Sequence, residues 1–280
     1  MNVYWLEQTE ADVSAEDDWL SANEAARLSR LRFPKRRADW RLGRWTAKRA
    51  VSDYLKTPPR PPDLAAIEIR PAPSGAPEVF IANRPADCTV SISHRGGVAA
   101  CAVGQAGATL GCDLELVEPR SEAFIADYFT PEEQALVAQS DAADRFRLVA
   151  LLWSTKESAL KALRAGLRLD TRSVIVTPGF ALVGRTPWSA RDAPVPLPEA
   201  GEAPTSGVSA MPMVAQAVPP ASVTASTSPE PWHPLQIRHT DGQIFHGWWQ
   251  LTGDLLRTVA ADPRPNPPIL VCLPLDQHPH

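Results

Sequence analysis

A short pattern occurs twice in this chain and limits the folds open to it. The hexapeptide at 45–50 (WTAKRA) resembles the one at 153–158 (WSTKES), 108 residues later. The tripeptide VAA also occurs twice, at 98–100 and 259–261, with an offset of 161 residues. The offsets differ by 53 residues, close to the length of a Pro/Ala-rich segment between the second copies. A duplication interrupted by an insertion explains both offsets.

The duplication predicts an α+β (α/β) fold built as a pseudo-dimer of two similar halves. Each half would be a small sheet packed on a long helix, with the functional site in the cleft between them. We expect the N-terminal half to span 1–108 and the C-terminal half 109–280. The segment at about 186–234 has almost no large apolar side chains and is predicted to be a disordered insertion.

Local signals predict the elements that carry the candidate site. Pro131 suits the first turn of a helix with Thr130 as its N-cap, and Gly166 suits the end of a longer helix. Helices are predicted at 36–55, 132–139 and 143–165. Strands are predicted at 67–70, 78–81, 89–93, 98–103, 109–116, 173–176, 244–249 and 256–261. The stretch 263–280 resembles a partly extended tail.

Composition excludes several classes of protein. The 280 residues are 44% hydrophobic and 21% charged, and the net charge of −4 argues against a general polyanion binder. No apolar run approaches the roughly 18 residues of a membrane span, and the acidic N-terminus is unlike a signal peptide. The four cysteines form no CxxC motif. We therefore expect a cytoplasmic protein in a reducing compartment, with no membrane partner.

Two carboxylates lie on one face of a predicted strand. Alternation places Asp113 and Glu115 together and puts Cys112 and Leu114 on the opposite face. Carboxylates at i and i+2 repel each other unless a cation lies between them. Mg²⁺, held by carboxylates and substrate phosphate oxygens, would relieve the repulsion. The alternative is a solvated strand face near a turn.

A second set lies along the predicted helix at 143–165. Trp153, Glu157 and Lys161 follow at i, i+4 and i+8 and form one stripe. The preceding residues are almost continuously apolar, so the helix is expected to be buried on several sides. A buried acid and base need partners, which favours a site. The alternative is an exposed ion pair worth about 0.3–0.5 kcal/mol.

His94 ends a predicted strand beside a Gly-Gly turn, which leaves room for a ligand. A structural hydrogen-bond donor is the alternative role. The chain has no GxSxG, GxxxxGK[ST] or GxGxxG motif, so hydrolase, P-loop and Rossmann sites lack support.

The stretch 27–49 holds ten basic residues and one acid. On a helix Arg37, Arg41, Arg44 and Lys48 share one face, which suits a polyphosphate ligand or an acidic protein partner. A solvated surface is the alternative. A nucleic-acid binder would need a stacking pattern around Trp40 and Trp45 that the sequence lacks.

Together these pieces resemble the Sfp-type 4'-phosphopantetheinyl transferases. The resemblance covers residues 25–185 and returns weakly at 245–263. Its carriers are Gly43-Arg44, Ser91-Ile92-Ser93-His94, Gly111-Cys112-Asp113-Leu114-Glu115, Phe129-Thr130-Pro131-Glu132-Glu133 and the segment from Trp153 to Lys161. A pseudo-dimer of two α+β halves is also the fold that the resemblance implies, so we expect a monomer.

The resemblance implies transfer of phosphopantetheine from coenzyme A to a serine of an apo acyl- or peptidyl-carrier protein, with release of adenosine 3',5'-bisphosphate. Asp113, Glu115 and Glu157 would hold Mg²⁺, for which Mn²⁺ could substitute. Glu157 would also accept the serine proton, and Lys161 would neutralise charge on the phosphates. Catalysis would thus rest on Asp113, Glu157 and Lys161, and Glu133 or Glu132 is a further candidate. The acceptor would serve fatty-acid, polyketide or nonribosomal peptide synthesis.

The resemblance also implies the contacts to coenzyme A. These would come from Arg44, Lys48, Arg70, Gly75, Ser93, His94, Lys156 and Lys161. The family often has a basic residue between the glycine and proline that are Gly75 and Pro77 here; this chain has Ala76, and we expect Arg70 to compensate. The alternative functions are a non-catalytic module that binds coenzyme A or a carrier protein and, less favoured, a nucleic-acid binder.

Overall fold

The computed structural model of the chain describes residues 1–55, 63–164, 168–178 and 231–271. The helices are α1 (Ala22–Ser29), α2 (Pro34–Tyr54), α3 (Glu122–Tyr128), α4 (Pro131–Gln139) and α5 (Ala142–Ala162). The strands are β1 (Tyr4–Thr9), β2 (Ile67–Pro71), β3 (Pro77–Ile81), β4 (Arg84–Pro85), β5 (Cys88–Arg95), β6 (Val98–Gln105), β7 (Thr109–Leu116), β8 (Val174–Pro178), β9 (His233–His239), β10 (Ile244–Thr252), β11 (Leu255–Asp262) and β12 (Ile269–Leu270). Single 3₁₀ turns lie at Glu10–Asp12, Leu64–Ala66 and Thr171–Ser173.

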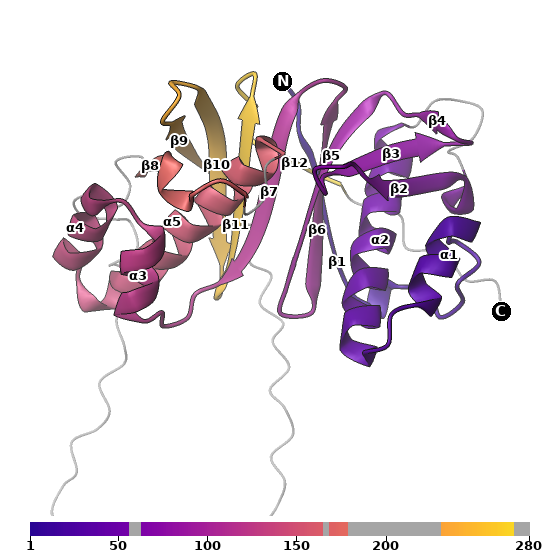
Figure 1. Cartoon of the computed structure of the whole chain (residues 1–280), viewed down its shortest axis with the longest axis horizontal. Coiled ribbons are helices and arrows are strands. Elements are labelled where there is room, and N and C mark those ends of the chain that lie inside the picture. Colours follow the sequence, from indigo (N-terminus) through magenta and orange to yellow (C-terminus); the bar gives the residue numbers. More distant parts are fainter. Residues whose placement is uncertain (56–62, 165–167, 179–230, 272–280) are drawn as a thin grey trace, which may run out of the picture.

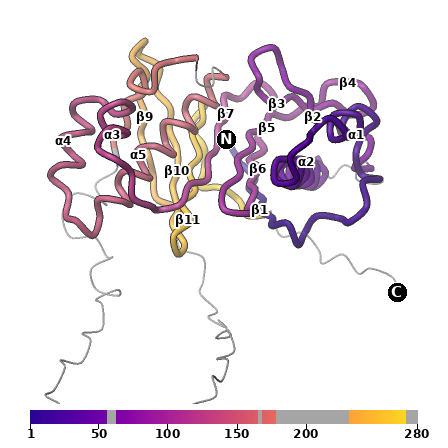
Figure 2. Tube along the Cα trace, turned by 60° about the horizontal axis from the view of Figure 1, so that its bottom comes forward, coloured from indigo at the N-terminus to yellow at the C-terminus, as the bar shows by residue number. Residues whose placement is uncertain are grey.

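Helices and sheets are mixed, as the sequence predicts, and each large sheet carries one long helix (Figures 1 and 2). The first sheet has the order β12-β1-β6-β5 and packs on α2 through Ala47 and Val51. The second has the order β7-β11-β10-β9-β8 and packs on α5 through Leu152 and Leu160. A small sheet, β2-β3-β4, joins the first half.

A further apolar core lies between the two large sheets. Ala100 and Ala102 of β6 pack there with Leu114 of β7 and with Val259 and Ala261 of β11. Both copies of the VAA tripeptide therefore contribute to the same interface. Their small side chains allow close packing, and β5 lies against β7 as a result.

A buried lysine occupies the same place in both long helices. Lys48 and Lys156 are each the fifteenth residue of a 21-residue helix, and neither side chain is exposed to solvent. Lys48 Nζ lies 2.5 Å from Glu24 Oε2, and Lys156 Nζ lies 2.8 Å from Glu133 Oε2. Burial lowers the pKa of both lysines, and the paired glutamates oppose that effect. Each ammonium thus forms a buried ion pair within its own half.

The partner glutamates are also equivalent. Each is the third residue of a short helix and completes a capping box, Glu24 with Ser21 and Glu133 with Thr130. The second carboxylate oxygen of each accepts a strand amide at 3.0 Å, from Ile69 in β2 or Val176 in β8. One glutamate therefore joins a helix start, a long helix and a strand in each case.

This arrangement corrects one expectation. Lys48 and Lys156 were expected to contact coenzyme A, but both ammonium groups are enclosed and hydrogen-bonded to main-chain carbonyl groups as well as to their glutamates. A ligand phosphate cannot reach them in this structure. Glu133 is likewise committed to the core.

The structure contains elements that were not predicted from the sequence, namely β1, α1, β4, α3, β9 and β12. Because β9 begins at His233, the expected insertion does not extend to residue 234. The rest of it up to 230, and Gly166, lie outside the described residues. The C-terminal β12 pairs in parallel with β1, so the chain returns to the first half across the expected boundary at 108/109.

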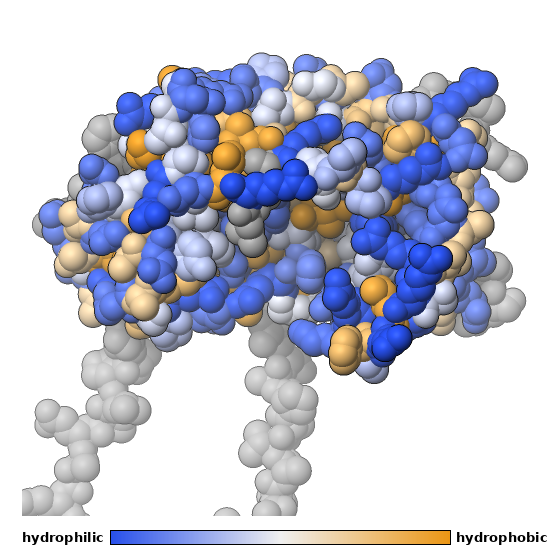
Figure 3. All heavy atoms as spheres, in the orientation of Figure 1, coloured by the Kyte–Doolittle hydropathy of each residue, from blue (hydrophilic) through white to orange (hydrophobic). Residues whose placement is uncertain are grey.

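No described helix is both long enough and apolar enough to cross a bilayer. The face of the molecule drawn in Figure 3 is mainly hydrophilic, with small apolar patches between charged side chains.

Breaking the Lys156–Glu133 ion pair tests how much it contributes to the stability of the fold. Lys156→Met leaves a carboxylate in the core without its cation, which should lower the free energy of unfolding by about 3–5 kcal/mol. The double variant Lys156→Met/Glu133→Gln removes the uncompensated charge and should lose less. Urea denaturation of the three proteins measures the difference. Equal losses in the single and double variants would contradict the account.

Candidate active site between the two halves

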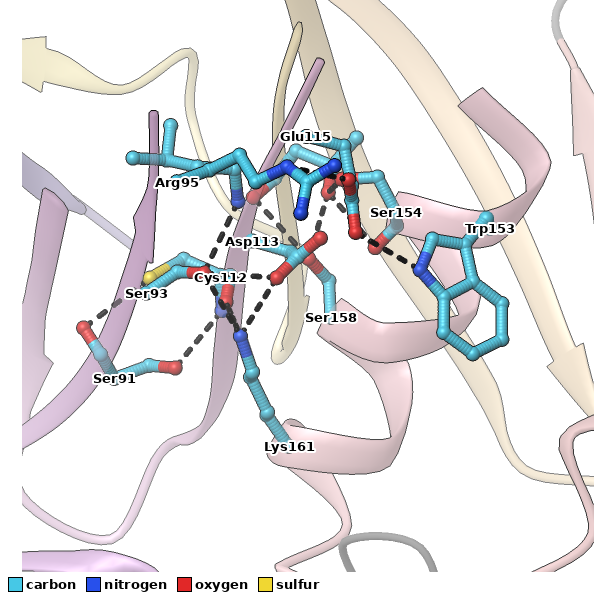
Figure 4. A network of polar contacts seen from close by, with 12 residues as sticks. Ser91, Ser93, Arg95, Cys112, Asp113, Glu115, Trp153, Ser154, Ser158 and Lys161 are labelled. Carbon is cyan, nitrogen blue, oxygen red and sulfur yellow. Dashed lines mark hydrogen bonds and ion pairs between the residues drawn. The ribbon is translucent and has the colours of Figure 1, made fainter. Parts of the chain in front are cut away.

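Lys161 of α5 places its ammonium group where β5 and β7 meet (Figure 4). Its Nζ donates to Asp113 Oδ1 at 2.7 Å, to Ser93 Oγ at 3.1 Å and to the carbonyl oxygen of Cys112 at 3.0 Å. Ser93 Oγ also donates to Asp113 Oδ1 at 2.8 Å. Burial lowers the pKa of Lys161, but the negative charge and hydrogen bond of Asp113 outweigh it, and the net pKa is raised. Lys161 therefore stays protonated at neutral pH.

Close packing of α5 on β7 brings these groups together. A Cβ atom on Gly111 would lie 1.8 Å from the carbonyl oxygen of Ser158, so only glycine fits there. The hydroxyl groups of Ser154 and Ser158 also lie 2.8 and 2.7 Å from Thr258 Oγ1 on β11. The helix is thus fixed against two strands of the sheet.

Glu115 lies on the same face of β7 as Asp113, as alternation predicts. Trp153 Nε1 donates to its Oε1 at 3.0 Å. Its Oε2 forms ion pairs with Arg95 at 3.4 Å and Arg120 at 3.2 Å. Burial and the negative charge of Asp113 raise the pKa of Glu115, although both arginines and the indole oppose the shift. Trp153 and Lys161 of the predicted stripe thus each contact a carboxylate of β7.

Glu157 lies between them in that stripe and completes a cluster of three carboxylates. Its Oε1 and Asp113 Oδ2 are buried and have no hydrogen-bond partner among the described residues. Burial raises the pKa of Glu157, and the charges of Asp113 and Glu115 raise it further against the effect of Lys161. The cluster therefore holds two unsatisfied oxygens and an excess of negative charge.

Asp113, Glu115 and Glu157 are the predicted ligands of a metal ion. Within the described residues, no group of three or more His, Cys, Asp or Glu side chains already has the spacing to hold an ion. The chemistry of the donor set nevertheless fits a hard divalent cation, because two carboxylate oxygens are free and the three carboxylates repel one another. The predicted ligands Asp113, Glu115 and Glu157 are close enough to interact electrostatically.

The expected contacts to coenzyme A fall into separate places. Ser93 faces Asp113, whereas the exposed His94 lines a cavity of about 140 Å³ with Lys35 and Asp39 of α2. Gly75 lines a larger cavity of about 340 Å³, in which Lys161 forms part of the wall. The site residues Ser93 and Lys161 thus lie between His94 and Gly75.

Two of the predicted arginines do not line either cavity. Arg44 Nε lies 4.0 Å from Glu24, and its guanidinium lies over the Trp40 ring. Arg70 donates to Glu68 at 2.8 Å and lies 4.1 Å from the centroid of the Phe80 ring.

The predicted basic face of α2 has partners within the chain. Arg41 pairs with Asp17 at 2.9 Å, and Arg37 donates to the carbonyl oxygen of Leu28 at 2.6 Å. This face therefore holds the N-terminal segment and α1. The exposed basic residues of the stretch 27–49 are Arg27 in α1, Arg30 and Arg32 after it, and Lys35 and Arg36 at the start of α2.

Sequence reasoning missed the arginines around Glu115. Arg95 and Arg120 each form an ion pair with Glu118 as well. Ser91, Ser93 and Arg95 alternate along β5, so strand periodicity could have placed Arg95 on the face of Ser93. Arg120 follows β7 in a loop, where no periodic signal exists.

Gly111 gives a test of the packing that positions the site. Gly111→Ala should cost at least about 1–3 kcal/mol of stability, because the added methyl group forces α5 away from β7. Gly43→Ala is the matched control: its Cβ would lie 3.7 Å from Ile92, an ordinary contact, inside α2. Alanine there should stabilise the helix by about 0.5–1 kcal/mol. Thermal unfolding of both variants measures these changes in stability. A Gly111→Ala variant as stable as wild type would contradict the close contact.

The raised pKa of Glu157 predicts how the stability of the fold depends on pH. Since that pKa lies above its ordinary value of 4.5, the folded chain binds the proton more tightly than the unfolded chain. Stability is therefore lost as pH rises above about 4.5, and the loss continues until the folded-state pKa is passed. With a chelator present, the Glu157→Gln variant should have a higher melting temperature than wild type at pH 7. Near pH 4 the two melting temperatures should be equal. Exposed Glu122 supplies the control variant Glu122→Gln; a wild type that melts higher than Glu157→Gln at pH 7 would contradict this.

This chain is similar to known 4'-phosphopantetheinyl transferases. The family model of the 4'-phosphopantetheinyl transferase superfamily matches residues 109–194. The 4'-phosphopantetheinyl transferase HetI of Nostoc sp. is 26% identical over 176 residues, which cover 62% of this chain and 72% of the Nostoc protein. A crystal structure of Helicobacter pylori holo-(acyl-carrier-protein) synthase with coenzyme A has a TM-score of 0.26 and 18% identity, over 37% of this chain and 99% of that one. The family model and the Nostoc relative support the assignment of this chain to the 4'-phosphopantetheinyl transferase superfamily.

Proposed function

We propose that this chain transfers the 4'-phosphopantetheine group of coenzyme A to a serine of an apo acyl- or peptidyl-carrier protein. One observation carries the proposal: Lys161, Asp113 and Glu157 converge between the halves, and Lys161 lines the larger cavity. A protonated lysine beside carboxylates suits the reaction, because phosphoryl transfer depends on alignment and on neutralising oxygen charge.

Asp113, Glu115 and Glu157 would hold Mg²⁺ or Mn²⁺, with the free oxygens of Asp113 and Glu157 as the first ligands. The bound cation would neutralise charge on the pyrophosphate of coenzyme A. His94 and Ser93 are proposed to contact phosphate oxygens from the strand that faces this cluster, and Arg44 remains a proposed contact to the nucleotide.

In the reaction, the serine hydroxyl oxygen bonds to the phosphorus that carries pantetheine. The bond from that phosphorus to the bridging oxygen breaks, and adenosine 3',5'-bisphosphate leaves with the electron pair. Glu157 accepts the serine proton on the carboxylate oxygen that does not hold the cation. Lys161 offsets the charge that develops on the phosphate oxygens, and Asp113 and Ser93 fix its ammonium group.

We also infer that the halves form a pseudo-dimer derived from one unit, and that the protein acts as a cytoplasmic monomer. The similar pairs Lys48–Glu24 and Lys156–Glu133 support a common origin, since each ties the start of a short helix to a long helix and to a strand amide. The expected halves 1–108 and 109–280 meet between β6 and β7.

The test is intact-mass measurement of several apo carrier proteins after incubation with the chain, coenzyme A and Mg²⁺. Wild type should add one phosphopantetheine group. Glu157→Gln should slow the transfer at least about 100-fold, since it removes the general base, and a chelator should stop it. Glu122→Gln is the matched control, an exposed carboxylate on α3 that pairs with Arg145, and should react like wild type.

The outcomes separate the alternatives. Coenzyme A binding without transfer to any carrier would favour a non-catalytic binding module. Failure to bind coenzyme A would refute the proposed function. Binding of random oligonucleotides at physiological salt would favour the nucleic-acid reading instead.

A further inference from the structure

The larger cavity has two very different walls. One is formed by the turn and strand start Ser74, Gly75, Ala76 and Pro77, which carry no charge. Gly75 has a φ of +92° and open space around its Cβ position, so the backbone itself is exposed to the cavity. The only charged residues among those lining it are Lys161 and Arg164, both from α5 or its end. The positive charge that the lining residues offer to an anion therefore comes from that side.

Lys161 has no donor to spare. Its three hydrogen bonds go to Asp113, Ser93 and the carbonyl oxygen of Cys112. Arg164, by contrast, forms one loose ion pair, with NH1 3.8 Å from Glu78 Oε1. Both side chains of that pair are close to half exposed, at 47% and 41%, so the pair is weak and easily exchanged for another anion.

The backbone of Arg164 adds a second observation. It follows the end of α5 with a φ of +54°, and its amide donates to the carbonyl oxygen of Lys161 at 2.9 Å. This left-handed conformation at a helix end favours glycine and costs free energy for a residue with a side chain. An arginine placed there against the local preference is typical of a functional position.

Arg70 does not compensate for Ala76 in the way the sequence analysis expects. Its guanidinium stacks on Phe80 and binds Glu68, and it is absent from the residues that line the cavity. The charge facing Ala76 comes from the opposite wall.

We propose that Arg164 binds a phosphate group of coenzyme A in the larger cavity, exchanging Glu78 for that phosphate. The inference rests on the proposed function, and it assigns to Arg164 the role of a ligand-binding residue. The phosphate is either the 3'-phosphate or the pyrophosphate, which carry the same chemistry. Bidentate hydrogen bonds from the guanidinium suit both.

Calorimetric titration with coenzyme A tests the assignment. Arg164→Gln should weaken binding at least about 10-fold, because a charged hydrogen bond is lost. Arg172→Gln is the matched control: it removes the same charge from an exposed arginine that pairs with Asp170. Arg164→Lys should recover only part of the affinity, because an ammonium group restores the charge but not the bidentate contact. Arg164→Gly should bind as weakly as Arg164→Gln while melting at or above the wild-type temperature, because glycine relieves the left-handed backbone.

A second titration with 3'-dephospho-coenzyme A identifies the phosphate. If Arg164→Gln and wild type bind this ligand equally, Arg164 contacts the 3'-phosphate; if the difference persists, it contacts the pyrophosphate. Equal coenzyme A affinity in Arg164→Gln and wild type would overturn the assignment and leave the proposed function intact. A wild type that binds no coenzyme A would overturn both.

Discussion

The close contact of α5 with β7 at Gly111 determines how the polar groups of the candidate site lie relative to one another. With a Cβ position 1.8 Å from the carbonyl oxygen of Ser158, any residue other than glycine would separate helix and strand. At this separation one helix face meets one strand face, and Trp153 and Lys161 reach Glu115 and Asp113. The stripe on α5 and the carboxylates on β7 run in opposite chain directions, so Trp153 lies beside Glu115 and Lys161 lies beside Asp113. A small displacement of α5 along β7 would therefore break both contacts.

The scaffold is repeated, but the chemistry is not. Both long helices are held by a buried lysine and a capping glutamate, and each glutamate also accepts a hydrogen bond from a strand amide. The residues that carry the site in the second helix, Glu157 and Lys161, correspond at the repeat offset of 108 to Arg49 and Asp53 in the first. The first half instead contributes Ser93 and His94 from its sheet edge. Under the proposed function, the residues before and after position 108 therefore have different roles in the site.

Sequence alone could predict the elements with strong local signals. The Thr130 cap and Pro131 give α4, and alternation gives β7 with its two carboxylates on one face. It could not predict β12, whose two residues pair with β1 only through tertiary contact, or β9, which begins at the end of a Pro-rich stretch.

The burial of Lys48 and Lys156 shows a different limit. Lysine is seldom enclosed, so the default expectation is a solvent-facing cation available to a phosphate. The signal that could have corrected it is the repeated S/T-x-x-E pattern at Ser21–Glu24 and Thr130–Glu133, which stands before both helices. Even so, the reach of each ammonium to its glutamate depends on how helix packs on helix, which no local pattern encodes.

The charge balance of the site bears on how its ligands would enter. Three carboxylates face one ammonium, and Arg95 and Arg120, which lie nearest, are shared with Glu118. A pyrophosphate approaching this cluster alone would meet net negative charge in a partly buried setting, where repulsion is poorly screened. Under the proposed function, a divalent cation held by Asp113 and Glu157 would offset this negative charge. Burial and the neighbouring carboxylates raise the pKa values of Glu115 and Glu157, so the folded chain holds these groups where their charged forms are disfavoured unless a cation lies beside them.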